Sequence, residues 1–278
     1  MSERVAVVTD STCYLPAELA GPVTVVPVQV VIGGASYDEG VDVTPAQVAA
    51  ALREFHVVTT SRPSPERFAN AYADAAAAGA TAVVSVHLSA DLSGTYESAV
   101  LAARRAELPV QVVDSRNVAM GLGFAVLAAA ARAAEGADAD RVAAEAVRRA
   151  HGAATLFYVD TLEFLRRGGR IGTAQAILGQ ALAVKPILAV VDGRVSPLEK
   201  VRTQSRALAR LAELAIDRAG TGPVDVAVHH LDAAERASGL AERLVAALPR
   251  ARLVTSEVGA VVGAHVGPGM VAVVVSPA

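Results

Sequence analysis

Valine-rich runs recur through the first half of the chain, and their alternation with helical patterns constrains the fold more than any other feature. The runs at residues 5–8, 82–86 and 110–113 have the length of buried strands. Polar turns follow these runs, and segments with helically spaced apolar residues separate most of them. Because parallel strands need helical crossovers, this pattern predicts a parallel sheet flanked by helices.

The second half of the chain has a different pattern. Two strand-like runs, at residues 186–191 and 194–201, flank the dipeptide Asp192-Gly193, which favours the primed turns of antiparallel hairpins. Helical patterns and further strand-like runs follow, and the last of these runs covers residues 271–275. A hairpin beside interspersed helices indicates an α+β arrangement.

We therefore expect a protein of the α/β class with two domains. The first is a parallel-sheet α/β domain over residues 1–155, and the second is an α+β domain over residues 156–278. No low-complexity linker separates the two parts, so the chain is free to cross between them more than once. The C-terminal strand is equally free to return to the first domain.

Four polar turns follow strand-like runs and are the first candidates for a binding site. They are Asp10-Ser11-Thr12, Thr60-Ser61-Arg62-Pro63-Ser64, Leu92-Ser93-Gly94-Thr95-Tyr96 and Asp114-Ser115. Ligands of parallel sheets bind beyond the carboxyl ends of the strands, so we expect all four turns at one edge. The two hydroxyl-rich turns also precede helices, where free N–H groups and the helix dipole favour a carboxylate or phosphate. The alternative is that these serines and threonines only cap helices and form turns.

Two glycine-containing motifs are further candidates. His265 lies among the glycines and proline of residues 263–269, where glycine would let a ligand approach the backbone. The alternative is a tight turn with an incidental histidine. In Arg166-Arg167-Gly168-Gly169-Arg170, the first two arginines suit a helix C-terminus capped by glycine. Arg170, beyond the glycines, remains the candidate for binding an anion.

Charge and cysteine content argue against several classes of protein. The net charge of −3 gives no electrostatic basis for binding nucleic acid. Cys13 is the single cysteine, so neither an internal disulfide nor a zinc–cysteine cluster can form. The longest apolar stretch, at residues 122–134, is too short to span a bilayer, and the N-terminus lacks a signal-peptide profile. We expect a cytoplasmic protein without integral membrane association.

Motifs for common cofactors and nucleophiles do not occur in the sequence. Neither lysine-containing phosphate loops nor Gly-x-Ser-x-Gly elbows are found, and no nucleotide-binding motif stands out. His229, His230 and Asp232 are a weak metal candidate, because adjacent strand residues point to opposite faces. No metal, cofactor or catalytic residue is therefore expected.

The ordered motifs resemble those of the DegV family over essentially the whole chain. Besides the hydroxyl turns and the glycine motif around His265, the resemblance rests on the opening Val-Val-Thr-Asp-Ser-Thr, on residues 161–171, and on Lys185-Pro186-Ile187-Leu188 and Lys200-Val201-Arg202-Thr203. It implies a fatty-acid-binding protein, the carrier subunit of a bacterial fatty-acid kinase that supplies phospholipid synthesis. The long-chain fatty acid is expected between the two domains.

The resemblance also implies roles for individual residues. Thr60 and Ser93 would hydrogen-bond the carboxylate, His265 would reach it from the other domain, and Arg170 would contact the kinase. The separate kinase would phosphorylate the bound carboxylate, while the carrier performs no chemistry. The implied ligand-binding residues are Thr60, Ser61, Ser93, Gly94, Thr95, Arg202 and His265.

Three positions depart from the family pattern. Arg62 stands where the family usually has glutamine, Tyr14 replaces a common aspartate, and His87-Leu88 replaces serine or small residues. Arg62 matters most, because it adds a cation beside the expected head-group site.

Two other functions compete with that of a carrier. A regulatory module could sense a lipid or another carboxylate with the same residues. An esterase-like enzyme could use Ser93 as nucleophile and His265 as base, but it lacks an identifiable acidic partner for the histidine and the nucleophile elbow.

Overall fold

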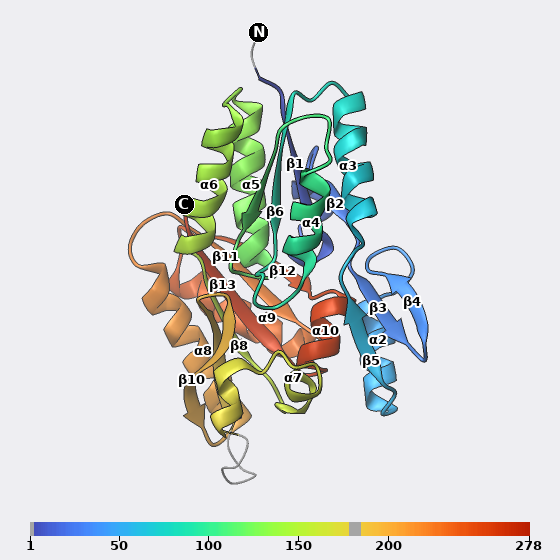
Figure 1. Cartoon of the computed structure of the whole chain (residues 1–278). Coiled ribbons are helices and arrows are strands. Elements are labelled where there is room, and N and C mark those ends of the chain that lie inside the picture. Colours follow the sequence, from blue (N-terminus) through green and yellow to red (C-terminus); the bar gives the residue numbers. More distant parts are fainter. Residues whose placement is uncertain (1–2, 178–184) are drawn as a thin grey trace. The chain divides into compact units, whose positions relative to one another are not determined.

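The computed structural model describes residues 3–177 and 185–278, and the chain divides into two compact units. The first unit comprises Met1–Gln29 and Ser61–Gly152, and the second comprises Val30–Thr60 and Ala153–Ala278. The sequence assigned residues 1–155 to one domain, whereas the segment Val30–Thr60 groups with the second unit. The chain thus passes between the units more than once (Figure 1).

The first unit is built on a four-stranded parallel sheet in the order β2-β1-β6-β7. In register, Val7 of β1 faces Val84 of β6. This sheet confirms the predicted α/β pattern, because the valine-rich runs form three of its four strands, β1, β6 and β7. Its strands are β1 (Val5–Asp10), β2 (Thr24–Val26), β6 (Ala82–His87) and β7 (Val110–Asp114).

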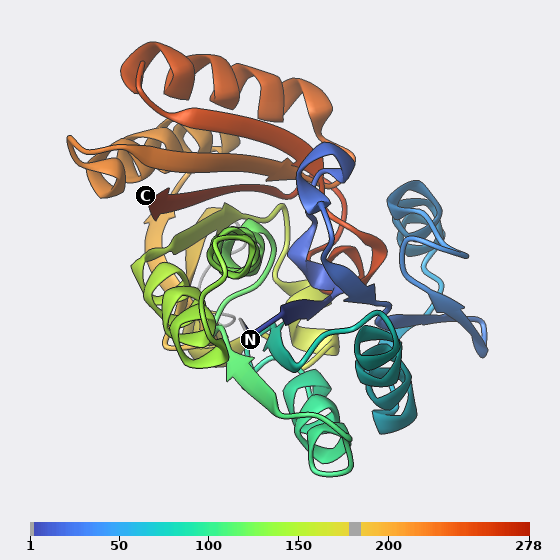
Figure 2. The ribbon, with the colours of Figure 1, turned by 90° about the horizontal axis from the view of Figure 1, so that it is seen from above.

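Helices cover both faces of this sheet. Val7 packs in a cluster with Leu122 of α5 and Val142 of α6, whereas the next residue, Val8, packs with Phe68 of α3. Adjacent strand residues point to opposite faces, so α5 and α6 lie on one side and α3 and α4 on the other (Figures 1 and 2). The helical segments are η1 (Ser11–Cys13), α1 (Ala17–Ala20), α3 (Pro65–Ala77), α4 (Thr95–Ala103), α5 (Met120–Ala134) and α6 (Ala139–Gly152).

The second unit contains a six-stranded mixed sheet in the order β10-β9-β8-β13-β11-β12. Only β11 and β12 of this sheet pair in parallel. The C-terminal strand β13 lies between β8 and β11 and therefore stays in the second unit. The strands are β8 (Ala154–Tyr158), β9 (Lys185–Val191), β10 (Arg194–Val201), β11 (Val224–His230), β12 (Arg252–Glu257) and β13 (Val271–Pro277).

The predicted hairpin is confirmed. Strands β9 and β10 pair antiparallel, and both turn residues have left-handed backbones, with φ of 50° at Asp192 and 80° at Gly193. These angles are those of a primed turn, whose twist matches that of the paired strands.

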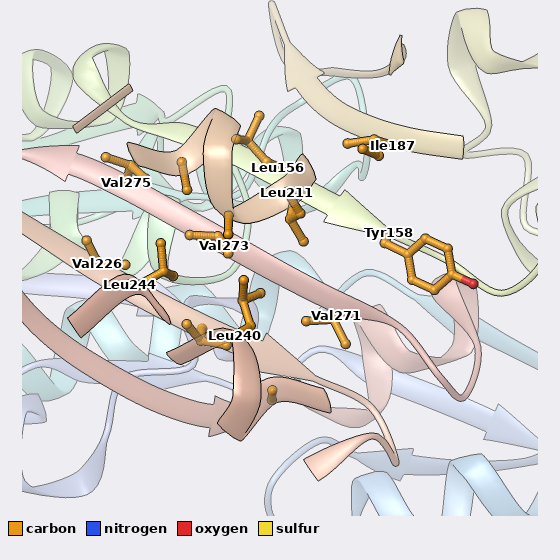
Figure 3. Close-up of a cluster of buried hydrophobic side chains, with 14 of the residues drawn as sticks. Leu156, Tyr158, Ile187, Leu211, Val226, Leu240, Leu244, Val271, Val273 and Val275 are labelled. Carbon is orange, nitrogen blue, oxygen red and sulfur yellow. The ribbon is translucent and has the colours of Figure 1, made fainter. Parts of the chain in front are cut away.

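Two long helices, α8 (Gln204–Ala219) and α9 (Ala234–Ala247), supply side chains to the core of the second unit. Leu211 of α8 and Leu240 of α9 lie in one buried cluster with Val273 of the central strand β13 (Figure 3). Burying one such leucine stabilises the fold by about 1.5 to 3 kcal/mol. This unit also contains α7 (Glu163–Arg167), η2 (Gly172–Ile177) and α10 (Ala260–Val266).

The segment that precedes the first hydroxyl motif forms a small three-stranded sheet, β4-β3-β5. Residues 23–32 contain two strands, β2 and β3, which belong to different sheets. Helix α2 starts at Pro45 and is capped by Thr44, which forms a reciprocal capping box with Gln47. The elements are α2 (Pro45–Arg53), β3 (Gln29–Ile32), β4 (Ala35–Asp38) and β5 (Val58–Ser61).

Candidate functional site

Thr60 and His265, 205 residues apart in sequence, form a hydrogen-bonded pair in the second unit. The distance from Thr60 Oγ1 to His265 Nε2 is 2.9 Å, and both residues are half-buried. The sequence placed Thr60 in a turn, but it belongs to strand β5. Residues 58–61 alternate between half-buried and exposed, and Thr60 lies on the half-buried face of the strand.

His265 lies on a helix and not in the glycine turn that the sequence suggested. Helix α10 runs over Ala260–Val266 and ends at Gly267, whose φ is 75°. The glycines here serve helix packing: a Cβ on Gly267 would collide with the ring of Phe164 in α7. Likewise, a Cβ on Gly168, which ends α7, would collide with the His265 imidazole. Glycine therefore lets α7 pack closely against α10 and orient the histidine.

His265 is neutral at physiological pH. Burial, and secondarily the nearby Arg170 cation, lowers its pKa to about 4. Its Nδ1 atom is buried and has no hydrogen-bond partner among the described residues. A proton on Nδ1 would be a buried donor without an acceptor, so we assign the proton to Nε2, which then donates to Thr60 Oγ1. The Thr60 hydroxyl keeps its own proton for another acceptor.

The arginines of the second glycine motif have separate surroundings. Arg166 and Arg167 both pair with Glu163 on the surface of α7 and hold the pKa of that carboxyl to about 2. This agrees with their predicted place at a helix C-terminus. Arg170 is half-buried beyond the helix, and its Nη1 donates to the carbonyl of Gly168 over 2.7 Å. It thereby lies beside the residue on which the His265 ring packs.

The second hydroxyl motif precedes helix α4 in the first unit. Ser93 Oγ and Thr95 Oγ1 are 2.9 Å apart, and Ser93 Oγ also accepts the Thr95 N–H over 3.3 Å. Ser93 is half-buried and Thr95 is fully buried. Gly94, at the N-cap of α4, has no side chain to cap the helix. The turn therefore presents one partly accessible hydroxyl beside a helix N-terminus.

Arg62 of the first hydroxyl motif packs against Gly94 of the second, and both residues belong to the first unit. A Cβ built on Gly94 would lie 2.5 Å from Arg62 Nη1, so the arginine side chain packs directly over the glycine. Ser61 is exposed and its Oγ donates to Gln29 Oε1 over 3.3 Å. Ser64 takes the N-cap position of α3 but makes no side-chain capping bond.

Three of the four predicted polar turns lie at the carboxyl ends of adjacent strands, and the fourth does not. Asp10, His87 and Asp114 end β1, β6 and β7 of the parallel sheet. Backbone N–H groups of the loop after β6 donate to the carboxylates of Asp10 and Asp114. Thr60 and Ser61 lie at the end of β5, which belongs to another sheet, so the prediction that all four turns share one sheet edge was wrong.

A buried polar network in the first unit was missed by sequence reasoning. The Asp10 carboxylate accepts hydrogen bonds from His87 Nδ1 and the Leu88 N–H, both over 3.0 Å. His87 Nε2 lies 2.7 Å from Ser85 Oγ, which the Tyr72 hydroxyl approaches to 2.9 Å. Burial raises the pKa of Tyr72 to about 12. The available signal was Ser85 and His87, two apart on one strand and hence on one face.

Two remaining candidates make no hydrogen bond to Thr60 or His265 within the described residues. Arg202 is exposed just before α8, and no hydrogen bond within the described residues joins it to Thr60 or His265. In the weak metal candidate, His229 is buried against Ser256, and Asp232 pairs with Arg53. The described part of the chain contains no cluster of three or more metal-ligating side chains.

Comparison with known proteins identifies the family. The family model described as "Uncharacterised protein, DegV family" matches residues 4–278. The chain belongs to the DegV family. A DegV domain-containing protein of Streptomyces coelicolor is 56% identical over 280 residues, which cover 99% of each chain.

Solved DegV structures share the fold of this chain. A fatty-acid-binding DegV family protein of Thermus thermophilus has a TM-score of 0.93 at 36% identity, covering 99% of this chain and 100% of its own. DegV of Bacillus subtilis, described as a fatty acid binding protein, has a TM-score of 0.92 at 32% identity, with all of both chains covered. The parallel-sheet first unit and the α+β second unit are thus those of DegV proteins.

None of the helices described for this DegV protein combines the length and apolar character needed to cross a bilayer.

Proposed function

We propose that this chain binds a long-chain fatty acid and that Thr60, Ser93 and His265 bind its carboxylate. The observation that carries the proposal is the hydrogen bond between Thr60 and His265. With the proton assigned to Nε2, the neutral imidazole donates to the threonine oxygen and leaves the hydroxyl proton available. The relatives from T. thermophilus and B. subtilis, both described as binding fatty acids, support the ligand class.

The chemistry of the proposed residues suits a carboxylate. A buried carboxylate needs several hydrogen-bond donors, because an unpaired ion in an apolar environment is very costly. Thr60 offers a hydroxyl in the second unit. In the first unit, Ser61 at the end of β5 and the turn of Ser93, Gly94 and Thr95 offer hydroxyls and N–H groups. Each buried methylene of the tail contributes about 0.8 kcal/mol, so the tail supplies most of the affinity.

We further propose that the chain presents the bound acid to a separate kinase, which transfers a phosphoryl group from ATP to the carboxylate. The carrier contributes binding and orientation but no reacting group. Arg170 is the proposed kinase contact, and Arg202 a further contact to the ligand, on the basis of the family motifs. A lipid sensor would bind the same ligand without this transfer.

An esterase mechanism has less support. His265 Nε2 is engaged with Thr60, and its Nδ1 has no carboxylate partner among the described residues. Ser93 Oγ is engaged with Thr95. A nucleophile–base–acid relay needs the serine and the acid on the two ring nitrogens of one histidine.

Removal of both hydroxyls tests the head-group assignment. We expect Thr60→Ala with Ser93→Ala to weaken oleate binding by about 10- to 100-fold, because each lost hydrogen bond to a charged group is worth about 1.5 to 3 kcal/mol, in part replaced by water. Isothermal titration of delipidated protein measures the affinity. The control is Ser36→Ala with Thr221→Ala, two exposed positions of the second unit. Unchanged oleate affinity in the first variant would refute the assignment.

A further inference from the structure

Arg62 is a cation at the head-group turn that the proposed function does not use. Its side chain packs over Gly94, the residue between the Ser93 and Thr95 hydroxyls. Arg62 is exposed, and no hydrogen bond or ion pair to another described residue engages its guanidinium. Arg166, Arg167 and Arg170 are, by contrast, engaged: the first two pair with Glu163, and Arg170 donates to the carbonyl of Gly168.

The position of Arg62 follows from the local sequence. It comes directly after strand β5 and before Pro63, and α3 begins at Pro65, so the backbone is confined on both sides. Gly94 has no Cβ to obstruct the arginine side chain, which passes through the space that a Cβ would fill. Pro63 is buried and further fixes the segment. A charged group is thus held at the turn by packing, with its donors unused.

Packing alone does not explain an arginine here. An exposed side chain gains little stability from its contacts, and a neutral glutamine could cover the same glycine. What the guanidinium adds is a permanent positive charge and planar hydrogen-bond donors suited to a carboxylate.

We propose that Arg62 determines specificity for an ionised head group, by attracting the carboxylate of the fatty acid to the Ser93–Gly94–Thr95 turn. This inference rests on the proposed function, because it requires a fatty acid whose carboxylate lies at that turn. Arg62 selects an acid over an uncharged lipid with the same tail, whereas Ser93 offers its hydroxyl to either.

Comparing the binding of a charged and an uncharged lipid distinguishes this role of Arg62 from a purely structural one. Oleate and oleyl alcohol have the same tail but differ in charge, so loss of a merely structural arginine weakens the binding of both equally. Loss of an electrostatic contact weakens the binding of the acid alone. The effect also falls with added salt, because mobile ions screen an exposed charge.

The experiment measures the affinities of delipidated protein for oleate and for oleyl alcohol at about 20 mM and about 500 mM salt. We expect Arg62→Gln to weaken oleate binding by about three- to tenfold at low salt, since a unit charge about 5 Å away acts through a largely aqueous medium. The affinity of Arg62→Gln for oleyl alcohol stays unchanged, and its loss of oleate affinity is smaller at high salt. Arg62→Lys keeps most of the preference for oleate over oleyl alcohol. The control is Arg104→Gln, which removes the same charge at the far end of α4, about 15 Å along the helix.

The outcomes separate the two proposals. Selective loss for oleate in Arg62→Gln but not in Arg104→Gln supports the role of Arg62. Equal loss for acid and alcohol, or no loss for either, overturns it while leaving fatty-acid binding intact. If the wild-type protein binds neither lipid, the proposed function fails and this inference fails with it.

Discussion

At the scale of residues, the Thr60–His265 pair depends on an imidazole that stays neutral. Burial excludes the proton, and Arg170 disfavours a second positive charge. The sequence identified both residues of the pair, because hydroxyl and histidine side chains in such motifs suit an anion. It did not reveal that they bond each other, since a contact across 205 residues depends on the tertiary fold.

The low pKa of His265 has a consequence for stability. The folded-state pKa of about 4 lies below the ordinary value of 6.5, so the unfolded chain binds the proton more readily. The resulting stability is complete above pH 6.5 and is lost as the pH falls toward 4. We expect the free energy of unfolding to fall less between pH 7 and pH 5 in His265→Gln than in the wild type.

Urea denaturation at the two pH values measures this difference. His229, whose pKa burial also lowers to about 4, is present in both proteins, so its contribution cancels. An identical pH dependence in wild type and variant would show that His265 titrates normally.

At the scale of elements, regular strands and helices were predicted well, whereas short elements near the site were not. Valine-rich runs became β1, β6 and β7, and Asp192-Gly193 became a hairpin turn, because both signals are local. Helix α10 was not predicted, because Gly263 inside it weakens a helix and Gly267 directly after it suggested a turn. Their value lies in the contacts with α7 and Leu231, which the local sequence does not show.

The buried network at the carboxyl ends of β1 and β6 is expected to stabilise the fold. Asp10→Ala would leave the Leu88 N–H and the His87 ring without their acceptor. We expect a loss of about 2 to 4 kcal/mol in the free energy of unfolding, because buried polar groups without partners are costly.

Urea denaturation of Asp10→Ala, with Asp74→Ala on the exposed side of α3 as control, measures this loss. A change below about 0.5 kcal/mol in Asp10→Ala would mean that the network does not stabilise the junction between the strands.

At the scale of the whole molecule, two units share one chain that passes between them more than once. Composition and periodicity predicted the α/β and α+β character of the two parts. They did not indicate that Val30–Thr60 groups with the second unit, because assignment of a segment to a unit depends on long-range packing. This grouping puts Thr60 and His265 in the same unit.

Arg170 is the residue through which we propose that the whole protein contacts its kinase. We expect Arg170→Ala to retain bound fatty acid but to slow phosphoryl transfer by about tenfold or more, since a lost contact to a charged partner is worth at least about 1.4 kcal/mol. Acyl-phosphate formation with a DegV-associated kinase and ATP measures the rate. Arg166→Ala, which removes an arginine paired with Glu163, is the control. Normal turnover in Arg170→Ala would exclude this arginine from the kinase contact.

Native mass spectrometry of the protein purified from bacteria detects a bound fatty acid without any added ligand. We expect a non-covalent adduct with the mass of a long-chain fatty acid, released on denaturation and strongly reduced in Thr60→Ala with Ser93→Ala. A protein that carries no fatty acid and takes up none from added oleate would contradict the proposed fatty-acid binding.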